Sequence, residues 1–339
     1  MPNYFRIFGA GEWGLALANH LTEQDNLVEI YIRNSKKYSE LNNAKYCNNL
    51  KIKFNNRATF NLLSKKTIFD DSTENFEIYN IIATSSSGFV DIIEKHKDYF
   101  SKHDSLTWIT KGIDHNSGLL FHKIIDNILS KKIDKCLLSG PSFARDLIDK
   151  NHITISIGST NLNLANTLTN AMQTEKFSLI YSNDLIGMEV SGVIKNIVAI
   201  LAGIMTTNGY NNQEINKLID MAKQEIHHIS SYIQSTDDKS YLVSNNQALL
   251  TLESPACLGD MLLTCFNDIS RNRQFGLKLG SKIQMQELLK DIGTVEGFLS
   301  TKTLYENKDK YQCGNIVHAA YKILYQSESP IEVIKGLLN

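Results

Sequence analysis

Features that would point to several protein classes are missing from this chain of 339 residues. Its formal net charge is −1, so the chain has no broad basic field, and we do not expect nucleic acid or acidic membranes as partners. We find no segment that resembles a signal peptide, and no uninterrupted apolar stretch of the roughly 18 residues that a membrane span needs. The sequence therefore predicts a cytoplasmic protein without membrane insertion.

Cysteine and histidine patterns are equally uninformative. The cysteines are scattered, odd in number and without a C-x-x-C pair, which indicates reduced thiols: Cys47, Cys136, Cys257, Cys265 and Cys313. His227 and His228 are adjacent, so they cannot share a helix face as two metal ligands four residues apart would. We therefore predict neither a disulfide framework nor a metal site.

The most informative feature present is a glycine triad near the N-terminus. Gly9, Gly11 and Gly14 lie between the apolar run 4–8 and a helical pattern that begins at Leu15. Glycine at this spacing permits a tight turn, close approach of the backbone to a pyrophosphate, and close packing of helix on strand. The helix N-terminus adds free N–H groups and a positive dipole end. The pattern predicts a dinucleotide-binding turn.

A second apolar run, residues 27–32, follows at the distance expected for the next strand of a βαβ unit. A carboxylate at the end of that strand holds the ribose 2′-OH of NAD, whereas arginine accommodates the 2′-phosphate of NADP. Here the strand ends in Arg33 and Asn34, which allows NADP. The alternative is that Arg33 stacks on adenine or points to solvent, and that NAD is also used. The predicted cofactor is therefore NAD or NADP.

Length and composition favour two domains in a globular protein. Hydrophobic residues make up 42% and charged residues 21%, and 339 residues are many for a single core. The first half alternates strand-like and helical stretches, as a parallel α/β sheet requires. The predicted strands are residues 4–8, 27–32, 78–83, 105–108, 136–138, 153–157 and 177–181. We predict an α/β fold: a Rossmann-like doubly wound sheet in residues 1–184, followed by an all-helical domain in residues 185–339.

Two of these strands run into small polar turns, residues 84–87 and 139–142, at the carboxyl edge where such folds bind ligands. Our default expectation is that their serines N-cap the following helices.

The second half contains a long apolar helical pattern over residues 187–205. Lys195 and Asn196 lie inside it. A lysine in so apolar a helix must reach solvent, pair, or face a polar cavity. One alternative is a lysine on an exposed stripe of the helix. The other is a general acid, or a cation beside a carbonyl, tuned by partial burial.

A second polar group follows further along. Asp260 and Thr264 are four residues apart and would share one face of a helix. Ser270 is placed to cap the next helix, and with Arg271 and Asn272 its N-terminus forms a candidate phosphate cradle. The alternative is a capped surface helix with solvated arginines.

Taken in order, these blocks resemble the bacterial type of NAD(P)-dependent glycerol-3-phosphate dehydrogenase. The matching segments are residues 9–14, 110–113, 138–144, 187–196, 259–265, 270–276 and 295–297. The resemblance implies a Rossmann domain followed by a helical substrate domain. It also implies reversible hydride transfer between NAD(P)H and dihydroxyacetone phosphate, which gives sn-glycerol 3-phosphate for phospholipid synthesis.

The resemblance further implies roles for single residues. Lys195 matches the catalytic lysine that supplies or accepts the proton at the substrate oxygen, with Lys111 and Asp260 as its catalytic partners. The implied substrate-binding residues are Lys111, Gly140, Ser142, Asn196, Thr264, Ser270, Arg271 and Asn272. The implied cofactor-binding residues are Gly9, Gly11, Glu12, Trp13, Gly14, Arg33, Asn34, Lys111, Ala144, Arg271 and Glu296.

Departures from the family pattern leave two other functions open. Met221 and Ala222 stand where the family usually has an arginine–glycine pair, within an altered stretch that begins at Gly209. One alternative is a related dehydrogenase that acts on a keto acid or another phosphorylated ketone. The other is a nucleotide-binding sensor without turnover. A homodimer is a further possibility, suggested by apolar helices such as residues 187–205.

Overall fold

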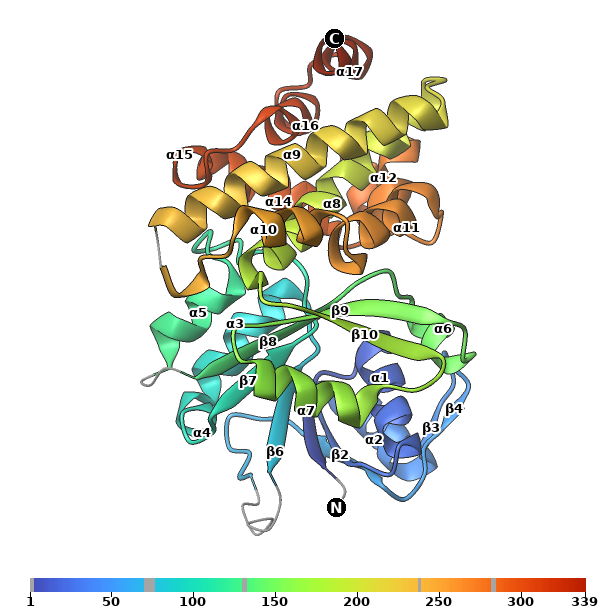
Figure 1. Cartoon of the computed structure of the whole chain (residues 1–339). Coiled ribbons are helices and arrows are strands. Elements are labelled where there is room, and N and C mark those ends of the chain that lie inside the picture. The colour runs from blue at the N-terminus through green and yellow to red at the C-terminus, as the bar shows by residue number, and fades with distance from the viewer. Residues whose placement is uncertain (1–2, 70–76, 130–132, 237–238, 282–284) are drawn as a thin grey trace. The chain divides into compact units, whose positions relative to one another are not determined.

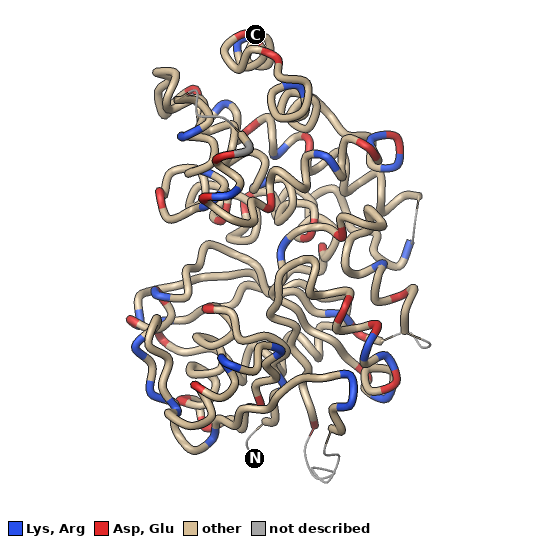
Figure 2. The backbone as a smooth tube through the Cα atoms, turned by 180° about the vertical axis from the view of Figure 1, so that it is seen from behind, with Lys and Arg blue, Asp and Glu red and all other residues tan. Residues whose placement is uncertain are grey.

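The computed structural model describes residues 3–69, 77–129, 133–236, 239–281 and 285–339. It divides into two compact units (Figure 1). Unit 1 comprises residues 1–110, 121–138 and 142–183, and unit 2 comprises residues 111–120, 139–141 and 184–339. Among the described residues, lysine and arginine lie interspersed with aspartate and glutamate in both units (Figure 2).

Unit 1 contains an eight-stranded sheet in the order β10-β9-β8-β7-β6-β1-β2-β5. Its strands are β1 (Tyr4–Phe8), β2 (Leu27–Ile32), β5 (Ala58–Leu62), β6 (Ile78–Ile82), β7 (Ser105–Trp108), β8 (Asp134–Ser139), β9 (Ile153–Ser159) and β10 (Phe177–Ser182). The pairs from β5 through β2, β1, β6 and β7 to β8 are parallel, as are β9 and β10. Ser159, at the end of β9, donates a 2.7 Å hydrogen bond to the carbonyl of Lys135, near the start of β8. The strands β9 and β10 therefore run opposite to the rest.

Helices connect these strands. They are α1 (Glu12–Glu23), α2 (Ser35–Ala44), α3 (Ser86–Lys95), α4 (Lys97–Phe100), α5 (Phe121–Ile128), α6 (Ala144–Ile148) and α7 (Leu162–Met172). A two-stranded antiparallel sheet, β3 (Tyr46–Cys47) and β4 (Ile52–Lys53), lies between α2 and β5. The predicted Rossmann-like α/β architecture is confirmed, and all seven predicted strands are present.

Sequence reasoning missed β5 and the antiparallel direction of β9 relative to β8. The outer strand β5 is only partly buried, so its apolar pattern is weak. A second surprise lies in the central strand β1, where the Arg6 side chain is fully buried. Its guanidinium donates to Glu29 at 2.7 Å and to Tyr99 at 3.0 Å, which provides the partners that a buried charge requires.

Unit 2 is helical. Its helices are α8 (Leu185–Thr207), α9 (Asn212–Thr236), α10 (Asn245–Leu252), α11 (Asp260–Phe266), α12 (Arg271–Gly280), α13 (Met285–Ile292), α14 (Glu296–Glu306), α15 (Lys308–Tyr311), α16 (Asn315–Tyr325) and α17 (Pro330–Leu338). Two shorter helical turns, η1 (Lys239–Tyr241) and the π-helical η2 (Pro255–Gly259), complete it. In Figure 1, α8 runs through the interior of this unit, with α9 along one side.

Two helical segments among the described residues have the length and composition of a membrane span: Leu185–Thr207 and Asn245–Phe266. The prediction that no uninterrupted apolar stretch is long enough for a membrane span did not count the first segment, because Glu189, Lys195 and Asn196 interrupt it. The apolar window of α8 is entirely buried within the protein, as expected of a core helix.

Glycines let two helices approach α8 closely. A Cβ at Gly276 of α12 would lie 2.1 Å from the carbonyl oxygen of Ile200, and one at Gly203 would lie 2.5 Å from that of Arg273. A Cβ at Gly297 of α14 would lie 2.3 Å from the carbonyl oxygen of Asn196. Any side chain at these positions would push the helices apart, and so these glycines fix α12 and α14 against α8.

Candidate active site

Lys195 lies in the middle of α8 and is 8% exposed. Its Nζ donates to Oδ1 of Asp260 at 2.9 Å and to Oγ1 of Thr264 at 3.3 Å. The alternative of a lysine on an exposed stripe is therefore wrong. The ammonium is instead held by a carboxylate and a hydroxyl, which compensates the cost of its burial.

Asp260 and Thr264 lie one turn apart on α11, as their spacing predicted. The Thr264 hydroxyl donates to the backbone carbonyl of Asp260 at 2.6 Å, so the hydroxyl oxygen can accept from Nζ of Lys195. The π-helical turn η2 precedes α11, and a Cβ at its last residue, Gly259, would lie 3.1 Å from the ring of Pro141. This close approach sets where α11 begins, and with it the position of the Asp260 carboxylate.

Lys111 reaches the same carboxylate from a different segment. Its Nζ donates to Oδ2 of Asp260 at 2.5 Å and to the carbonyl of Gly140 at 3.0 Å. Its side chain as a whole is 24% exposed. Burial lowers the pKa of Lys111 to about 8, helped by the neighbouring charge of Lys195 and opposed by Asp260.

The three charged groups form a compact electrostatic unit. Two ammonium groups share the two oxygens of one carboxylate, so the cluster carries a net charge of +1 when both lysines are protonated. Such a cluster can attract an anionic ligand, stabilise negative charge that develops on an oxygen, and transfer a proton to it.

The predicted substrate residues Asn196 and Asn272 are buried and bond to each other. Nδ2 of Asn272 donates to Oδ1 of Asn196 at 2.9 Å, and Oδ1 of Asn272 accepts from the backbone N–H of Gly297 at 2.9 Å. Asn196 also donates to the carbonyl of Gly192 at 3.2 Å. These amides connect α8, α12 and α14 next to Lys195.

Ser270 caps α12, as predicted, by accepting from the backbone N–H of Arg273. Arg271 begins the helix and is exposed. No ion pair involves it among the residues that the structure describes. Arg273 is buried instead and donates to Asp268 at 2.9 Å and to the carbonyl of Cys265 at 2.5 Å. Of the two arginines, Arg271 is the one free to bind a ligand.

Glu296 begins α14 and pairs with a residue that sequence reasoning did not select. Its Oε1 lies 3.1 Å from Nε2 of His115, and Nδ1 of that ring lies 2.9 Å from Oγ1 of Thr303. His115 lies four positions after Lys111, and this proximity was the only feature of the sequence that could have selected it.

In unit 1, the glycine triad forms the predicted turn between β1 and α1. Gly9 has φ +125°, and a Cβ there would lie 2.4 Å from the carbonyl oxygen of Ala83. A Cβ at Gly14 would lie 2.6 Å from the carbonyl oxygen of Gly9. Gly11 differs, because the nearest atom to its Cβ would be 3.9 Å away. Nothing in the protein itself requires glycine at this position.

The space at Gly11 fits a bound anion. Gly11 is the N-cap of α1 and offers no side-chain cap, so the first-turn N–H groups keep their capacity to bind a ligand. Glu12, the first helical residue, is exposed. Trp13 donates its indole N–H to Oγ of Ser142 at 3.0 Å.

The structure corrects the expectation that the serines of both turns cap helices. Ser142 bonds to Trp13, and Phe143 rather than a serine is the N-cap of α6, which begins at the buried Ala144. Ser85 occupies the N-cap position of α3 but makes no capping bond, and its hydroxyl lies 3.2 Å from that of Ser87. Both turns therefore keep their helix N-termini uncapped by serine.

At the end of β2, Arg33 pairs with Asp91 of α3 at 3.1 Å. Asn34 caps α2 by accepting from the backbone N–H of Lys37 at 2.9 Å. The Arg33 side chain remains 49% exposed.

The structure thus brings five predicted residues together in one cluster centred on the Asp260 carboxylate: Lys111, Gly140, Lys195, Asp260 and Thr264. The predicted cofactor residues of unit 1 form a separate group at the glycine turn. No cluster of three metal-ligating side chains occurs within the described ranges.

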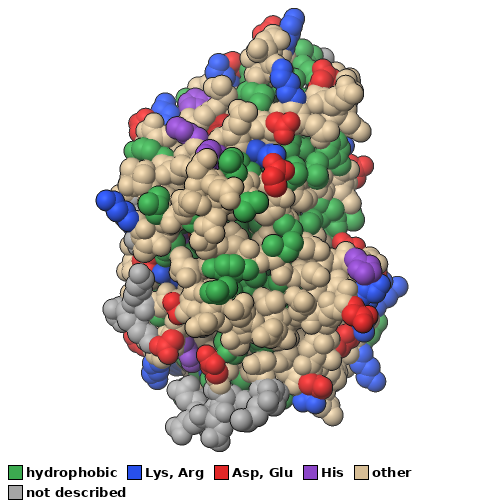
Figure 3. Space-filling view, in the orientation of Figure 1, with side chains coloured by type: hydrophobic (Ala, Val, Ile, Leu, Met, Phe, Trp, Pro, Cys, Tyr) green, Lys and Arg blue, Asp and Glu red, His purple; other side chains and the backbone are tan. Residues whose placement is uncertain are grey.

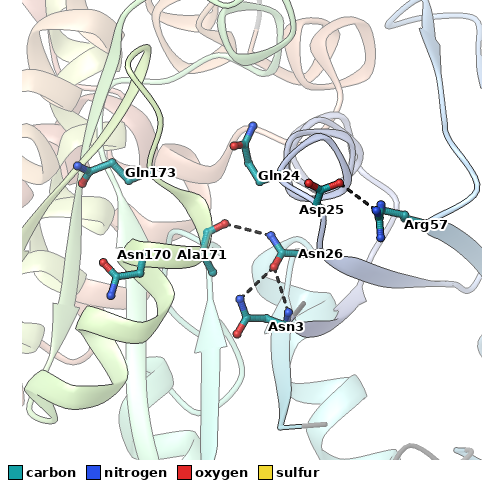
Figure 4. A pocket seen from close by; sticks show the side chains of 8 residues that line it. All are labelled: Asn3, Gln24, Asp25, Asn26, Arg57, Asn170, Ala171 and Gln173. Carbon is teal, nitrogen blue, oxygen red and sulfur yellow. Dashed lines mark hydrogen bonds and ion pairs between the residues drawn. The ribbon is translucent and has the colours of Figure 1, made fainter. Parts of the chain in front are cut away.

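A hollow of about 480 Å³ also lies in unit 1 (Figure 4). Its lining is rich in amides and includes an Asp25–Arg57 ion pair of 2.9 Å. Asn3, Asn26 and Arg57 stand just before β1, β2 and β5. The hollow is therefore at the amino edge of the sheet, whereas the glycine turn is at the carboxyl edge.

Comparison with known proteins identifies the family. The family models described as NAD-dependent glycerol-3-phosphate dehydrogenase N-terminus and C-terminus match residues 5–165 and 184–335. A glycerol-3-phosphate dehydrogenase [NAD(P)+] of Clostridium botulinum is 32% identical over 338 residues, which cover 98% of this chain and 96% of that protein. The protein of the same description in Francisella tularensis subsp. novicida is also 32% identical and covers 100% and 98%.

Solved structures agree. The crystal structure of glycerol-3-phosphate dehydrogenase from Coxiella burnetii superposes with a TM-score of 0.83 at 25% identity, over 100% of this chain and 99% of that one. The corresponding yeast enzyme, from Saccharomyces cerevisiae, has a TM-score of 0.79 at 16% identity over the whole of both chains, which shows a shared fold.

Proposed function

The chain belongs to the NAD-dependent glycerol-3-phosphate dehydrogenase family, and from this premise we propose that it reversibly transfers a hydride between NAD(P)H and dihydroxyacetone phosphate to give sn-glycerol 3-phosphate. The observation that carries the proposal is the pair of lysines on one carboxylate, Lys111 and Lys195 on Asp260. The product is the backbone of phospholipids, so we place the enzyme in lipid biosynthesis.

The lysine pair suits the reduction of a carbonyl. As hydride reaches carbon, the substrate oxygen gains negative charge and needs a cation or an acid beside it. We assign Lys195 as the proton donor in reduction and the acceptor in oxidation, and its place on the core helix α8 fixes its position. Lys111 holds the same oxygen or the neighbouring hydroxyl. Asp260 orients both ammonium groups, and Thr264 fixes the position of Lys195.

The phosphate needs its own anchor. The N-terminus of α12 offers Arg271, whose guanidinium is exposed. An arginine at a helix N-terminus combines a bidentate donor with a favourable dipole. We assign phosphate binding to Arg271 with Ser270 and Asn272, and assign Gly140, Ser142 and Asn196 to the walls around the small substrate.

NAD(P)H supplies the hydride when bound. The uncapped turn at Gly11 fits a pyrophosphate, with Gly9, Glu12, Trp13 and Gly14 shaping the turn. Arg33 and Asn34 would hold the adenosine end, and Lys111, Ala144, Arg271 and Glu296 are the other residues that we propose for cofactor binding. We accordingly assign cofactor binding to residues 1–184, apart from residues 111–120 and 139–141, which fold with unit 2, and assign substrate binding and catalysis to residues 185–339 with those two segments.

We further propose a cytoplasmic enzyme that forms a homodimer. All five cysteines are free, which suits a reducing compartment. The core helix α8 is buried within its own unit and cannot supply the interface. Exposed apolar residues of α10 and α11 are better candidates: Leu249, Leu250, Leu262 and Phe266. Figure 3 shows apolar side chains at the surface of the helical unit. Sedimentation at several concentrations tests the dimer.

The reaction is tested by adding dihydroxyacetone phosphate to the protein with NADH, and separately with NADPH, and measuring the loss of cofactor absorbance. We expect rapid oxidation of the cofactor that depends on the phosphate, with unphosphorylated dihydroxyacetone as the control. Binding of both cofactors without oxidation would favour the nucleotide sensor. Oxidation with a keto acid, but not with dihydroxyacetone phosphate, would favour a related dehydrogenase.

A further inference from the structure

The Arg33 guanidinium, just after the end of β2, is held by the helix α3. Its Nη1 lies 3.1 Å from Oδ2 of Asp91 in α3, and Oδ1 of the same carboxylate pairs with Lys95 one turn later. The two cations lower the pKa of Asp91 against the opposing effect of its partial burial, so this carboxylate is charged at neutral pH.

A glycine permits this approach. A Cβ at Gly88 would lie 3.0 Å from Nη2 of Arg33 and 3.0 Å from Cβ of Thr84. The guanidinium therefore rests against the first turn of α3, where a side chain at Gly88 would crowd it. Asp91 lies one turn further along the same helix. The helix α3 thus sets the position of the Arg33 guanidinium, because Gly88 leaves space for it and the Asp91 carboxylate pairs with it.

This arrangement bears on how the site treats the two cofactors. The 2′-phosphate of NADPH carries about −1.5 to −2 charges at neutral pH, whereas the 2′-OH of NADH is neutral. A phosphate that approaches Arg33 must share the guanidinium with the Asp91 carboxylate and is repelled by it. A 2′-hydroxyl experiences no comparable repulsion.

We propose that Asp91 is a specificity-determining residue: by pairing with Arg33 it weakens the recognition of a 2′-phosphate and so allows the enzyme to use NADH beside NADPH. The inference rests on the proposed cofactor role of Arg33. Asp91 acts through Arg33 and touches no reacting atom, so it is a positioning residue.

The pair is suited to this role because the fold does not depend on it. The side chains of Arg33 and Asp91 are 49% and 32% exposed, and ion pairs this accessible contribute little to stability. Asp91→Asn keeps the shape of the side chain and removes its charge. Glu94→Gln is the matched control, since Glu94 is exposed on the same helix and loses the same charge.

Ligand binding without turnover tests the proposal. Isothermal titration compares adenosine 2′,5′-bisphosphate with adenosine 5′-diphosphate, and nicotinamide fluorescence compares NADPH with NADH. We expect Asp91→Asn to tighten binding of adenosine 2′,5′-bisphosphate and NADPH by about threefold to tenfold, with changes of less than about twofold for the other two ligands. Glu94→Gln should change none of the four. A double variant, Arg33→Gln with Asp91→Asn, should lose the gain.

Two results would overturn the proposal. Equal tightening of all four ligands would mean a general electrostatic effect, and unchanged ratios would mean that the 2′-phosphate binds away from Arg33. Because these measurements need no substrate, they stand apart from the proposed reaction. A protein that shows the shift but does not reduce dihydroxyacetone phosphate would contradict the proposed function alone.

Discussion

Lys111 and Asp260 come from segments far apart in the chain, yet Nζ of the lysine lies 2.5 Å from Oδ2 of the aspartate. The other oxygen of that carboxylate holds Lys195 at 2.9 Å. One carboxylate therefore sets the position of two ammonium groups, and the first predictions concern this cluster.

Lys195→Met should reduce kcat by about 10²- to 10⁴-fold, the usual contribution of a positioned general acid. The Kd for NADH should stay nearly unchanged, because Lys195 serves the substrate oxygen. Steady-state kinetics and a fluorescence titration check both parts. Lys302→Met, an exposed lysine of α14, is the control. Strong residual turnover would remove Lys195 from the role of proton donor.

Asp260→Asn should destabilise the protein by roughly 3–5 kcal/mol, since it leaves two ammonium groups in a mostly buried place without their carboxylate. Thermal and urea unfolding measure the change. Asp268→Asn is the comparison, because Asp268 also pairs with a cation but is 70% exposed. That variant should lose less than about 1 kcal/mol. Equal losses would mean that Asp260 is not the partner the two lysines depend on.

The value of kcat/KM for dihydroxyacetone phosphate should fall above about pH 8, approaching tenfold per pH unit, as Lys111 loses its proton. Lys111→Arg keeps the charge at all these pH values and should remove the fall, even if the absolute rate is lower. A fall at the same pH in the variant would assign it to another group.

The same pKa shift predicts a dependence of stability on pH. The ordinary value for lysine is 10.5, so between pH 8 and 10.5 the unfolded chain binds more protons at Lys111 than the folded one. The contribution of this group to the free energy of unfolding therefore rises over that window, and it is constant below it. Urea unfolding of the wild type and of Lys111→Met across this range should show the difference.

Arg271→Ala should raise the KM for dihydroxyacetone phosphate by about tenfold or more while the melting temperature stays the same, because its guanidinium is exposed and serves the phosphate. Arg273→Ala should instead lower the melting temperature, because it leaves the buried carbonyl of Cys265 without this donor. Should Arg271→Ala leave KM unchanged, the phosphate is held elsewhere.

Gly11→Ala and Gly14→Ala should separate binding from folding. The structure has room for a methyl group at Gly11, so the variant should fold normally but bind NADH and NADPH weakly. At Gly14 the methyl group would lie 2.6 Å from the carbonyl oxygen of Gly9, and the variant should lose stability as well. Normal cofactor affinity in Gly11→Ala would place the pyrophosphate away from this turn.

Local patterns predicted much of the fold. Residues 187–205 form a buried helix because apolar residues occupy most of its surface, and the triad forms a turn because φ +125° at Gly9 suits only glycine. The outer strand β5 and the direction of β9 were missed, since both depend on which strand lies alongside. The buried Arg6 was missed for the same reason, because its partners Glu29 and Tyr99 come from other elements.

The sequence by itself determined the family, the glycine turn, the core helix and the residue types of the site, because each is encoded within a short stretch of chain. Only the tertiary structure decided how they combine. It brought Lys111 and Lys195 to the carboxylate of Asp260. It also gave Glu296 its partner His115 and paired Arg33 with Asp91. The physical reason is that charge pairing and pKa depend on distance in space and on burial, which packed helices and strands set and which spacing along the chain does not record.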